Sequence, residues 1–364
     1  PTTSIACTQD QACWACYATN RQVPRGHHPR RSGFVHCLYQ LILRRIPSVR
    51  SQFGKLGMQS LRSRLFYHLM RRQLAKSRQV NLSIEAIRAG GEKSSGKLGK
   101  LPKDIEVEST TIEGLKAEWL RPSEPRNSAL LLYLHGGAYV SGSIVTHRRL
   151  AAKLGVAARA STLILDYRLA PENPFPAAVD DALRCYLALR ASHPSATIAI
   201  AGDSAGGGLA VALCLRLRDG GFEPPAALAL LSPWTDLTLG NKTHETKAAV
   251  DPFFPDRSIL RGAAAVYAGS LALNDPGISP QFADLSRLPP TLIHVGSLEA
   301  LLDDALILKE RMSEGGTAVE LDVFNGMWHV WQAFAGLFPE ADQSIARLGA
   351  FVGGHLTKSG TQVV

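Results

Sequence analysis

Short apolar runs and longer helical patterns alternate through most of the chain. Strands are expected where four to six apolar or β-branched residues follow one another, and helices where apolar residues recur every three or four positions. The runs predicted as strands are 129–134, 162–166, 197–201, 227–231, 291–295 and 319–324. The helical patterns are 148–158, 177–191, 205–219, 301–314 and a long final helix from 330 to 351. This alternation predicts an α/β fold, with a mostly parallel sheet covered by helices on both faces.

The segment before the first parallel strand has a different pattern. Residues 56–89 are helical in character, with Leu61, Leu65, Leu69 and Met70 about one turn apart, and a second short helix is expected at 83–88. A Gly/Ser/Lys linker covers 90–103. Two antiparallel strands, 105–112 and 115–120, follow around a Glu-Gly turn.

One interval interrupts the alternation. Between 234 and 288 there is no clear strand, only a helical stretch near 257–270. We expect 235–288 to be an insertion above the strand ends, where a cap would lie. The predicted domain organisation is therefore a basic, poorly ordered extension (1–50), N-terminal cap helices with a linker (51–100), and the main α/β domain (101–364). A basic membrane-surface helix at 34–46 is the alternative interpretation of the extension.

The net charge of +9 is unevenly distributed. Residues 1–103 contain 19 Lys/Arg and 3 Asp/Glu, whereas the remaining residues contain 21 and 28. The main domain is thus mildly acidic, which argues against nucleic acid as a partner. No run of eighteen apolar residues occurs, so no transmembrane segment is expected.

Six cysteines give no extracellular disulfide pattern. Four precede residue 40, and Cys13-Trp14-Ala15-Cys16 fits neither a zinc finger nor a thioredoxin-like setting. Cys185 and Cys214 lie on apolar helical faces and are expected to be core thiols. We therefore predict no metal site and a cytoplasmic location.

A nucleophile motif lies between the predicted strand 197–201 and the helix 205–219. Gly202, Ser204 and Gly206 form Gly-x-Ser-x-Gly, which in this strand–turn–helix context is typical of a nucleophile elbow. Because the turn is sharp, side chains at the two glycines would collide with neighbouring backbone. The alternative is a glycine-rich turn that binds phosphate. The elbow predicts that Ser204 projects above the sheet edge, with the helix N-terminus beside it.

A serine nucleophile also requires an oxyanion hole. His135-Gly136-Gly137-Ala138-Tyr139 directly follows the strand 129–134. Adjacent glycines let backbone N–H groups approach a substrate oxygen, so we expect Gly136, Gly137 and Ala205 to form the oxyanion hole. His135 is expected to be structural because it precedes the nucleophile.

The base and its orienting acid should follow Ser204 along the chain. His329 lies in the loop after the last predicted strand and is the expected base; His294 falls within a strand and His355 near the end of the chain. Glu299 lies nearest the preceding strand end and is favoured as the acid. Asp303 is the alternative; Asp303 and the third candidate, Asp304, lie in a helical first turn where acids are common.

Six motifs together resemble the hormone-sensitive-lipase family of bacterial carboxylesterases. They are HGGAY, YRLAPENPFPAA, GDSAGG, SPWTD, DPFF and GMWH, and the similarity spans about 56–351. The resemblance implies an α/β-hydrolase fold with a helical cap and hydrolysis of short- to medium-chain acyl esters without a cofactor. Ala138 stands where the family usually has glycine, and Glu299 where it usually has Asp.

Other functions stay open on sequence alone. An amidase or another deacylating hydrolase would use the same three side chains. A small-molecule receptor of the same fold is a further alternative, although such receptors tend to lack the histidine that is present here as His329. The expected partner is a small-molecule acyl ester, and a homodimer is possible because relatives often dimerise.

Overall fold

Eight strands form one twisted sheet in the order β1-β2-β4-β3-β5-β6-β7-β8. The computed structural model describes residues 59–77, 83–96, 100–126 and 128–357, all within the unit Ser51–Val364. The predictions for residues 1–50, including the Cys13–Cys16 pattern, lie outside the described residues. The strands are β1 (Ile105–Ile112), β2 (Leu115–Pro122), β3 (Ala129–Leu134), β4 (Ser161–Leu165), β5 (Thr197–Asp203), β6 (Leu228–Leu231), β7 (Thr291–Gly296) and β8 (Val319–Phe324).

The strand pairing confirms the predicted mostly parallel sheet. β1 and β2 are antiparallel, as is the pair β2 and β4, while all remaining neighbours are parallel. β3, β4, β6 and β7 are buried along their whole length, as expected for strands covered on both faces. The carboxyl ends of β3, β5, β6, β7 and β8 consequently meet at one edge of the sheet.

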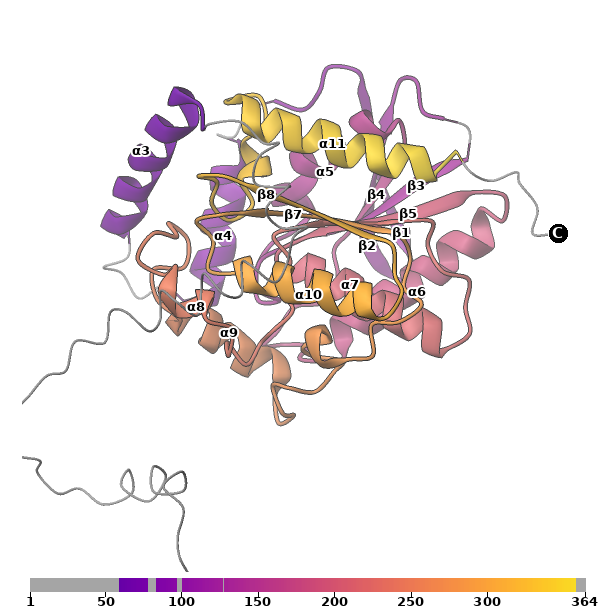
Figure 1. Cartoon of the computed structure of the whole chain (residues 1–364). Coiled ribbons are helices and arrows are strands. Elements are labelled where there is room, and N and C mark those ends of the chain that lie inside the picture. The colour runs from indigo at the N-terminus through magenta and orange to yellow at the C-terminus, as the bar shows by residue number, and fades with distance from the viewer. Residues whose placement is uncertain (1–58, 78–82, 97–99, 127, 358–364) are drawn as a thin grey trace, which may run out of the picture. The chain divides into compact units, whose positions relative to one another are not determined.

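Helices cover the sheet in two layers (Figure 1). α5 (Ile144–Ala158) and α11 (Pro339–His355) pack together on one face, and α6 (Ala177–Ser192), α7 (Ala205–Asp219) and α10 (Leu302–Glu314) lie on the other. Each layer encloses its own apolar cluster. Residues that alternate along a strand divide between the two: Leu131 and Tyr133 belong to the cluster under α5 and α11, and Leu132 and Leu134 to the other.

The final helix is shorter than the predicted 330–351 and begins later. A 3₁₀ turn, η3 (Trp331–Phe334), comes first, and α11 starts at Pro339. Gly336 has a φ of +93°, which is not helical. Pro339 disfavours a helical backbone in the residue before it. The apolar pattern over 330–351 is real, but these two residues divide it.

The N-terminal helices also differ in detail from the prediction. α4 (Ile84–Ser95) is capped by the Ser83 side chain, which accepts from the Ala86 N–H. It continues through Gly90 and Gly91, where a linker was expected. α3 (Leu61–Ser77) is a helix as predicted, but its leucines point outward: Leu61, Leu65 and Leu69 are 80%, 64% and 56% exposed.

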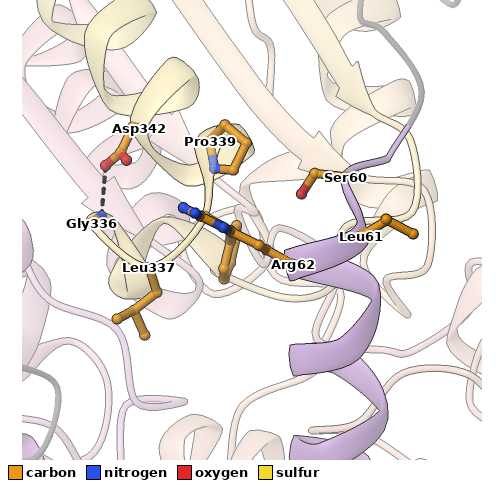
Figure 2. Close-up of a pocket in the computed structure, with 8 residues that line it drawn as sticks. Ser60, Leu61, Arg62, Gly336, Leu337, Pro339 and Asp342 are labelled. Carbon is orange, nitrogen blue, oxygen red and sulfur yellow. Dashed lines mark hydrogen bonds between the residues drawn. The ribbon is translucent and has the colours of Figure 1, made fainter.

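The two regions predicted to form a cap contain helices. The insertion contains α8 (Thr243–Thr246), α9 (Ser258–Ala268) and the 3₁₀ turn η2 (Pro280–Phe282), with no strand. α3 contacts this insertion: the Tyr67 hydroxyl donates to the Val250 carbonyl and the Arg71 guanidinium to the Ala249 carbonyl. A hollow of about 420 Å³ separates the start of α3 from residues 336–342 (Figure 2).

None of the helices in the described ranges combines the length and the apolar character needed to cross a membrane.

Candidate active site

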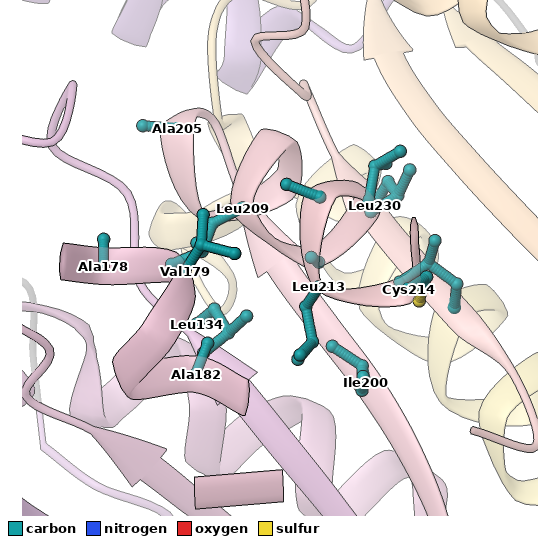
Figure 3. Packing of buried hydrophobic residues seen from close by; sticks show 14 of the residues in the cluster. Leu134, Ala178, Val179, Ala182, Ile200, Ala205, Leu209, Leu213, Cys214 and Leu230 are labelled. Atoms are coloured by element: carbon teal, nitrogen blue, oxygen red, sulfur yellow. The ribbon is translucent and has the colours of Figure 1, made fainter. Parts of the chain in front are cut away.

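The turn between β5 and α7 is the elbow predicted from the sequence. Ser204 has a φ of +53°, a conformation that costs energy for any residue with a side chain. A Cβ on Gly202 would lie 2.3 Å from the Gly206 carbonyl oxygen, and one on Gly206 2.1 Å from the Leu134 carbonyl oxygen. Glycine is therefore required at both positions. Beyond the turn, Ala205, Leu209 and Leu213 anchor α7 against the sheet (Figure 3).

Three side chains from three strand ends converge at this turn. His329 Nε2 lies 2.9 Å from Ser204 Oγ, and His329 Nδ1 lies 3.0 Å from Glu299 Oε2. All three side chains are buried, with Glu299 fully enclosed. The structure thus brings together the three residues expected to act as nucleophile, base and acid.

The carboxylate of Glu299 is held by further donors. Its Oε1 accepts from the Ser232 hydroxyl at 2.7 Å and from the Gly296 N–H at 2.6 Å. Ser232 also accepts from the Val330 N–H at 3.2 Å, so it connects the acid to the residue after His329. Burial raises the pKa of Glu299 above its usual value, while the hydrogen bonds from His329, Gly296 and Ser232 favour its ionised form.

The competing acids have other partners. Asp303 accepts from the Thr243 N–H, and Asp304 accepts from the N–H groups of Thr235 and Asp236. Both carboxylates therefore fasten the start of α10 to the insertion instead of orienting His329.

The other candidate histidines are also engaged elsewhere. His294 pairs with Asp322 and Ser344. His355 contacts the Phe351 carbonyl oxygen, and His135 is enclosed beneath the ring of Tyr167, with ring centroids 4.2 Å apart. Burial lowers the pKa of His135 to about 3, so it is neutral.

The charge balance around His329 favours the imidazolium. Burial alone would lower its pKa, but the hydrogen bond and the charge of Glu299, together with the charge of Asp251, raise it above 6.5. Asp251 accepts from the N–H groups of Phe253, Phe254 and Ala300 and thereby ties the insertion to the loop of Glu299. The ring of Phe254 lies 4.8 Å from the His329 ring.

The loop after β3 is strained beside Ser204. Gly137, Ala138 and Tyr139 all have positive φ, of 123°, 55° and 63°. A Cβ on Gly137 would lie 2.1 Å from the Ser141 carbonyl oxygen, so glycine is required there. Tyr139 is fixed by stacking on Tyr267 of α9, with centroids 3.8 Å apart.

The N–H of Gly136 has a protein acceptor. It donates to Asp203 Oδ1 at 3.1 Å, and the same oxygen accepts from the Tyr133 hydroxyl at 2.7 Å. The other oxygen, Oδ2, lies 3.4 Å from His147 Nε2. Within the described ranges, no backbone acceptor is found for the N–H groups of Gly137, Ala138 or Ala205.

Sequence reasoning missed three residues of this site. Asp203, Ser232 and Asp251 stand in the motifs GDSAGG, SPWTD and DPFF, but a motif does not reveal that its carboxylate or hydroxyl supports a neighbouring loop. Their signal was a polar residue at the end of a buried strand for Asp203, one directly after a buried strand for Ser232, and an acid in an apolar stretch for Asp251.

Among the described residues, no group of three or more His, Cys, Asp and Glu side chains is arranged to hold a metal ion. Cys185 and Cys214 are buried free thiols, and burial raises the pKa of each to about 12.

The fold and the Ser–His–Glu arrangement define an α/β hydrolase with a serine nucleophile motif. A family profile described as the alpha/beta hydrolase fold matches residues 131–333. An acetyl-hydrolase of Streptomyces hygroscopicus is 42% identical over 262 residues, which cover 72% of this chain and 86% of that protein.

Two solved structures are similar in fold and sequence. The crystal structure of an esterase from the bacterial hormone-sensitive lipase family has a TM-score of 0.77 and 39% identity, covering 82% of this chain and 100% of that one. The crystal structure of EstE5 soaked with p-nitrophenyl butyrate has a TM-score of 0.77 and 38% identity, covering 82% of this chain and 99% of that one. This chain belongs to the alpha/beta hydrolase fold family, and its resemblance to the hormone-sensitive-lipase esterases is confirmed.

Proposed function

We propose that this chain, a serine hydrolase of the carboxylesterase class, hydrolyses short- to medium-chain acyl esters through an acyl-enzyme on Ser204. One observation carries the assignment of residues: a continuous hydrogen-bonded chain from Ser204 Oγ through the His329 ring to Glu299, with distances of 2.9 and 3.0 Å. This arrangement activates a hydroxyl that would otherwise be a weak nucleophile.

In the first half of the reaction, Ser204 Oγ attacks the ester carbonyl carbon while His329 Nε2 takes the hydroxyl proton. Glu299 orients the ring and stabilises the imidazolium. The tetrahedral intermediate collapses, the bond from carbon to the alkoxy oxygen breaks, and His329 returns its proton to the departing alcohol. Water then attacks the acyl-enzyme with His329 again as base, which releases the acid and restores Ser204.

The oxyanion of both intermediates requires N–H donors. Gly136 was expected among them, but its N–H donates to Asp203 and cannot serve the substrate at the same time. We therefore propose Gly137 and Ala205 from the original set, with Ala138 as the third donor. A methyl group on residue 138 leaves its N–H intact, and one such donor is worth roughly 3–4 kcal/mol in the transition state.

The surroundings of the site support a preference for short acyl groups. Ser204 is only 5% exposed, and Phe254 lies directly against His329. The similar proteins support the same class, since one is named an acetyl-hydrolase and another was soaked with a butyrate ester.

The first test compares Ser204→Ala with the exposed Ser270→Ala on p-nitrophenyl acetate and butyrate. Removing the nucleophile should lower kcat at least about 1,000-fold, while the circular dichroism spectrum stays unchanged. Ser270→Ala should keep full activity. Turnover retained by folded Ser204→Ala would overturn the assignment.

A second test identifies the bond that is hydrolysed and the residue that is acylated. Ester turnover should exceed amide turnover on matched acyl groups; the reverse would favour an amidase. A fluorophosphonate probe should label Ser204 in the parent chain, and it should label Ser204 more slowly in Glu299→Gln. Mass spectrometry identifies the labelled residue. Stoichiometric ligand binding without turnover would favour a receptor.

We also propose a reducing compartment such as the cytoplasm, because Cys185 and Cys214 are free thiols, and a homodimer in solution. Sedimentation at several concentrations tests the dimer.

A further inference from the structure

The outer face of α3 is an amphipathic surface without a described partner. Leu61, Leu65 and Leu69, here called the leucine face, follow one another at four-residue spacing and therefore lie on one side of the helix. They are 80%, 64% and 56% exposed, although leucine is among the side chains most often buried.

The opposite side of α3 prevents these leucines from turning inward. Phe66 packs against Trp328 at 5.9 Å between ring centroids, and Tyr67 is bonded to the Val250 carbonyl. Ser63 is buried and donates to Glu340. Because these three contacts fix the inner face, α3 cannot turn about its axis to bury the leucines. The fold therefore keeps the leucine face exposed.

Cations surround the leucine face. Arg62, Arg64 and Arg72 are exposed, and α3 contains no Asp or Glu. No carboxylate in the described ranges lies within ion-pair distance of these three guanidinium groups, whereas the arginines of the main domain commonly have such partners, for example Arg88 with Glu172.

The hollow at the start of α3 extends the apolar surface (Figure 2). Leu61 lines it together with Leu337, which is 46% exposed. The side chain of Arg62 reaches from α3 toward Pro339 across it. The one carboxylate among its lining residues, Asp342, accepts from the Gly336 N–H.

We propose that this face of α3 docks on an anionic lipid surface. A helix with apolar residues on one side and arginines beside them lies in the lipid interface, with the leucines among acyl chains and the guanidinium groups at anionic head groups. Each arginine near such a surface strengthens binding about fivefold.

Charge argues against the other occupants. A second copy seated on the same face by two-fold symmetry would bring two sets of unpaired arginines together. Residues 1–58 are themselves basic, with eight Lys/Arg against one Asp, so they offer α3 no complementary charge. An anionic lipid surface supplies both the apolar phase and the opposite charge.

The test uses the full chain and vesicles of phosphatidylcholine with or without 30% phosphatidylglycerol (roughly the anionic content of a charged bilayer). Sedimentation with vesicles measures binding. One variant carries Leu61→Gln, Leu65→Gln and Leu69→Gln, and a second carries Arg62→Gln, Arg64→Gln and Arg72→Gln. The matched control replaces exposed apolar residues elsewhere, Ile259→Gln and Leu271→Gln, which are 51% and 46% exposed.

The parent chain should bind only the anionic vesicles, and less so at high salt. The arginine variant should lose on the order of 100-fold in affinity, and the leucine variant a comparable amount, while the control binds like the parent. Hydrolysis of soluble p-nitrophenyl acetate should be unchanged in all of them, which shows that they are folded. If the leucine variant is unstable, the arginine variant alone still tests the proposal.

Three results would overturn the proposal. The first is equal binding to neutral and anionic vesicles. The second is undiminished binding by both variants, which would place the lipid contact elsewhere in the chain. The third is conversion of a dimer to a monomer by the leucine variant with vesicle binding intact, which would make the face a subunit interface.

Discussion

Each oxygen of Glu299 has a separate task. Oε2 faces His329, and Oε1 accepts from Ser232 and Gly296. A glutamate is one methylene longer than the aspartate usual in this family, and the two additional donors hold the longer side chain in a single orientation. The carboxylate therefore both fixes the imidazole ring and raises its pKa.

Glu299→Gln should lower kcat by about 10³- to 10⁴-fold, because the neutral amide neither balances the imidazolium nor enforces its tautomer. Asp303→Asn should have little effect.

The activity of the parent enzyme should depend on pH through His329, whose pKa is raised above its ordinary value. Activity should fall as the pH drops through that pKa, since the base must be neutral. Without the glutamate, burial dominates and the residual activity should extend to lower pH. A pH–rate profile of Glu299→Gln that shifts to higher pH instead would contradict this assignment.

Ser232 contacts Glu299 and Val330 and is expected to position the acid and the base without taking part in the reaction itself. Ser232→Ala removes the donor to Glu299 and the acceptor for Val330, which should cost about 1–3 kcal/mol in unfolding free energy and lower kcat more than it changes KM. Thr235→Val is the matched control, because the Thr235 hydroxyl is buried without a hydrogen-bond partner among the described residues. Its stability should be unchanged or higher. Urea denaturation and steady-state kinetics measure both effects.

The sequence was sufficient to predict that Ser204, His329 and Glu299 come together, because chain order and strand ends restrict the choice to a few positions. It was not sufficient for Gly136. The direction of a backbone N–H depends on which carboxylate approaches it, and Asp203 reaches that N–H only because β3 and β5 are neighbours, with Leu134 opposite Gly202.

At the scale of elements, the elbow depends on close approach between β3, β5 and α7. Gly206→Ala should destabilise the protein by at least about 3 kcal/mol, since the new Cβ would meet the Leu134 carbonyl at 2.1 Å. Gly262→Ala, within α9, meets nothing within 4 Å and should stabilise by about 0.5–1 kcal/mol. Thermal denaturation of the two variants measures the difference. A Gly206→Ala protein as stable as the parent would mean that the strand and helix can separate without cost.

The predicted elements were most accurate where apolar runs are bounded by turns. The strands of the parallel sheet and the hairpin of β1 and β2 lie within a few residues of the expected positions. The final helix and α4 were misjudged because single residues decide their ends: Pro339 starts α11, and the two glycines in α4 do not stop it. The outward leucines of α3 could not be foreseen, since spacing reveals a face but not what it contacts.

At the scale of the whole molecule, the helices are not held equally tightly, and α4 is held less tightly than α7. α4 has no buried residue, while most residues of α7 are buried. Arg88 is the principal attachment of α4: it donates to the Val140 and Ala170 carbonyls and pairs with Glu172. α4 therefore depends on a few polar contacts near the loop that follows β3.

Hydrogen exchange should accordingly be faster in α4 than in α7, because local opening requires less apolar surface to be exposed. Arg88→Gln should accelerate exchange in α4 further and leave α7 unchanged. Peptide-level mass spectrometry provides the measurement. Equal protection of the two helices in the parent protein would show that α4 opens only with global unfolding.

Asp203 directly precedes Ser204, the proposed nucleophile, yet its carboxylate oxygen accepts from the Gly136 N–H in the loop that follows β3. In the proposed mechanism, this hydrogen bond fixes the distance between the Ser204 hydroxyl and the N–H donors that stabilise the oxyanion. Substitutions in the insertion 235–288 replace neither partner of this hydrogen bond. A substitution at 203 would instead alter attack and charge stabilisation together, whatever the substrate.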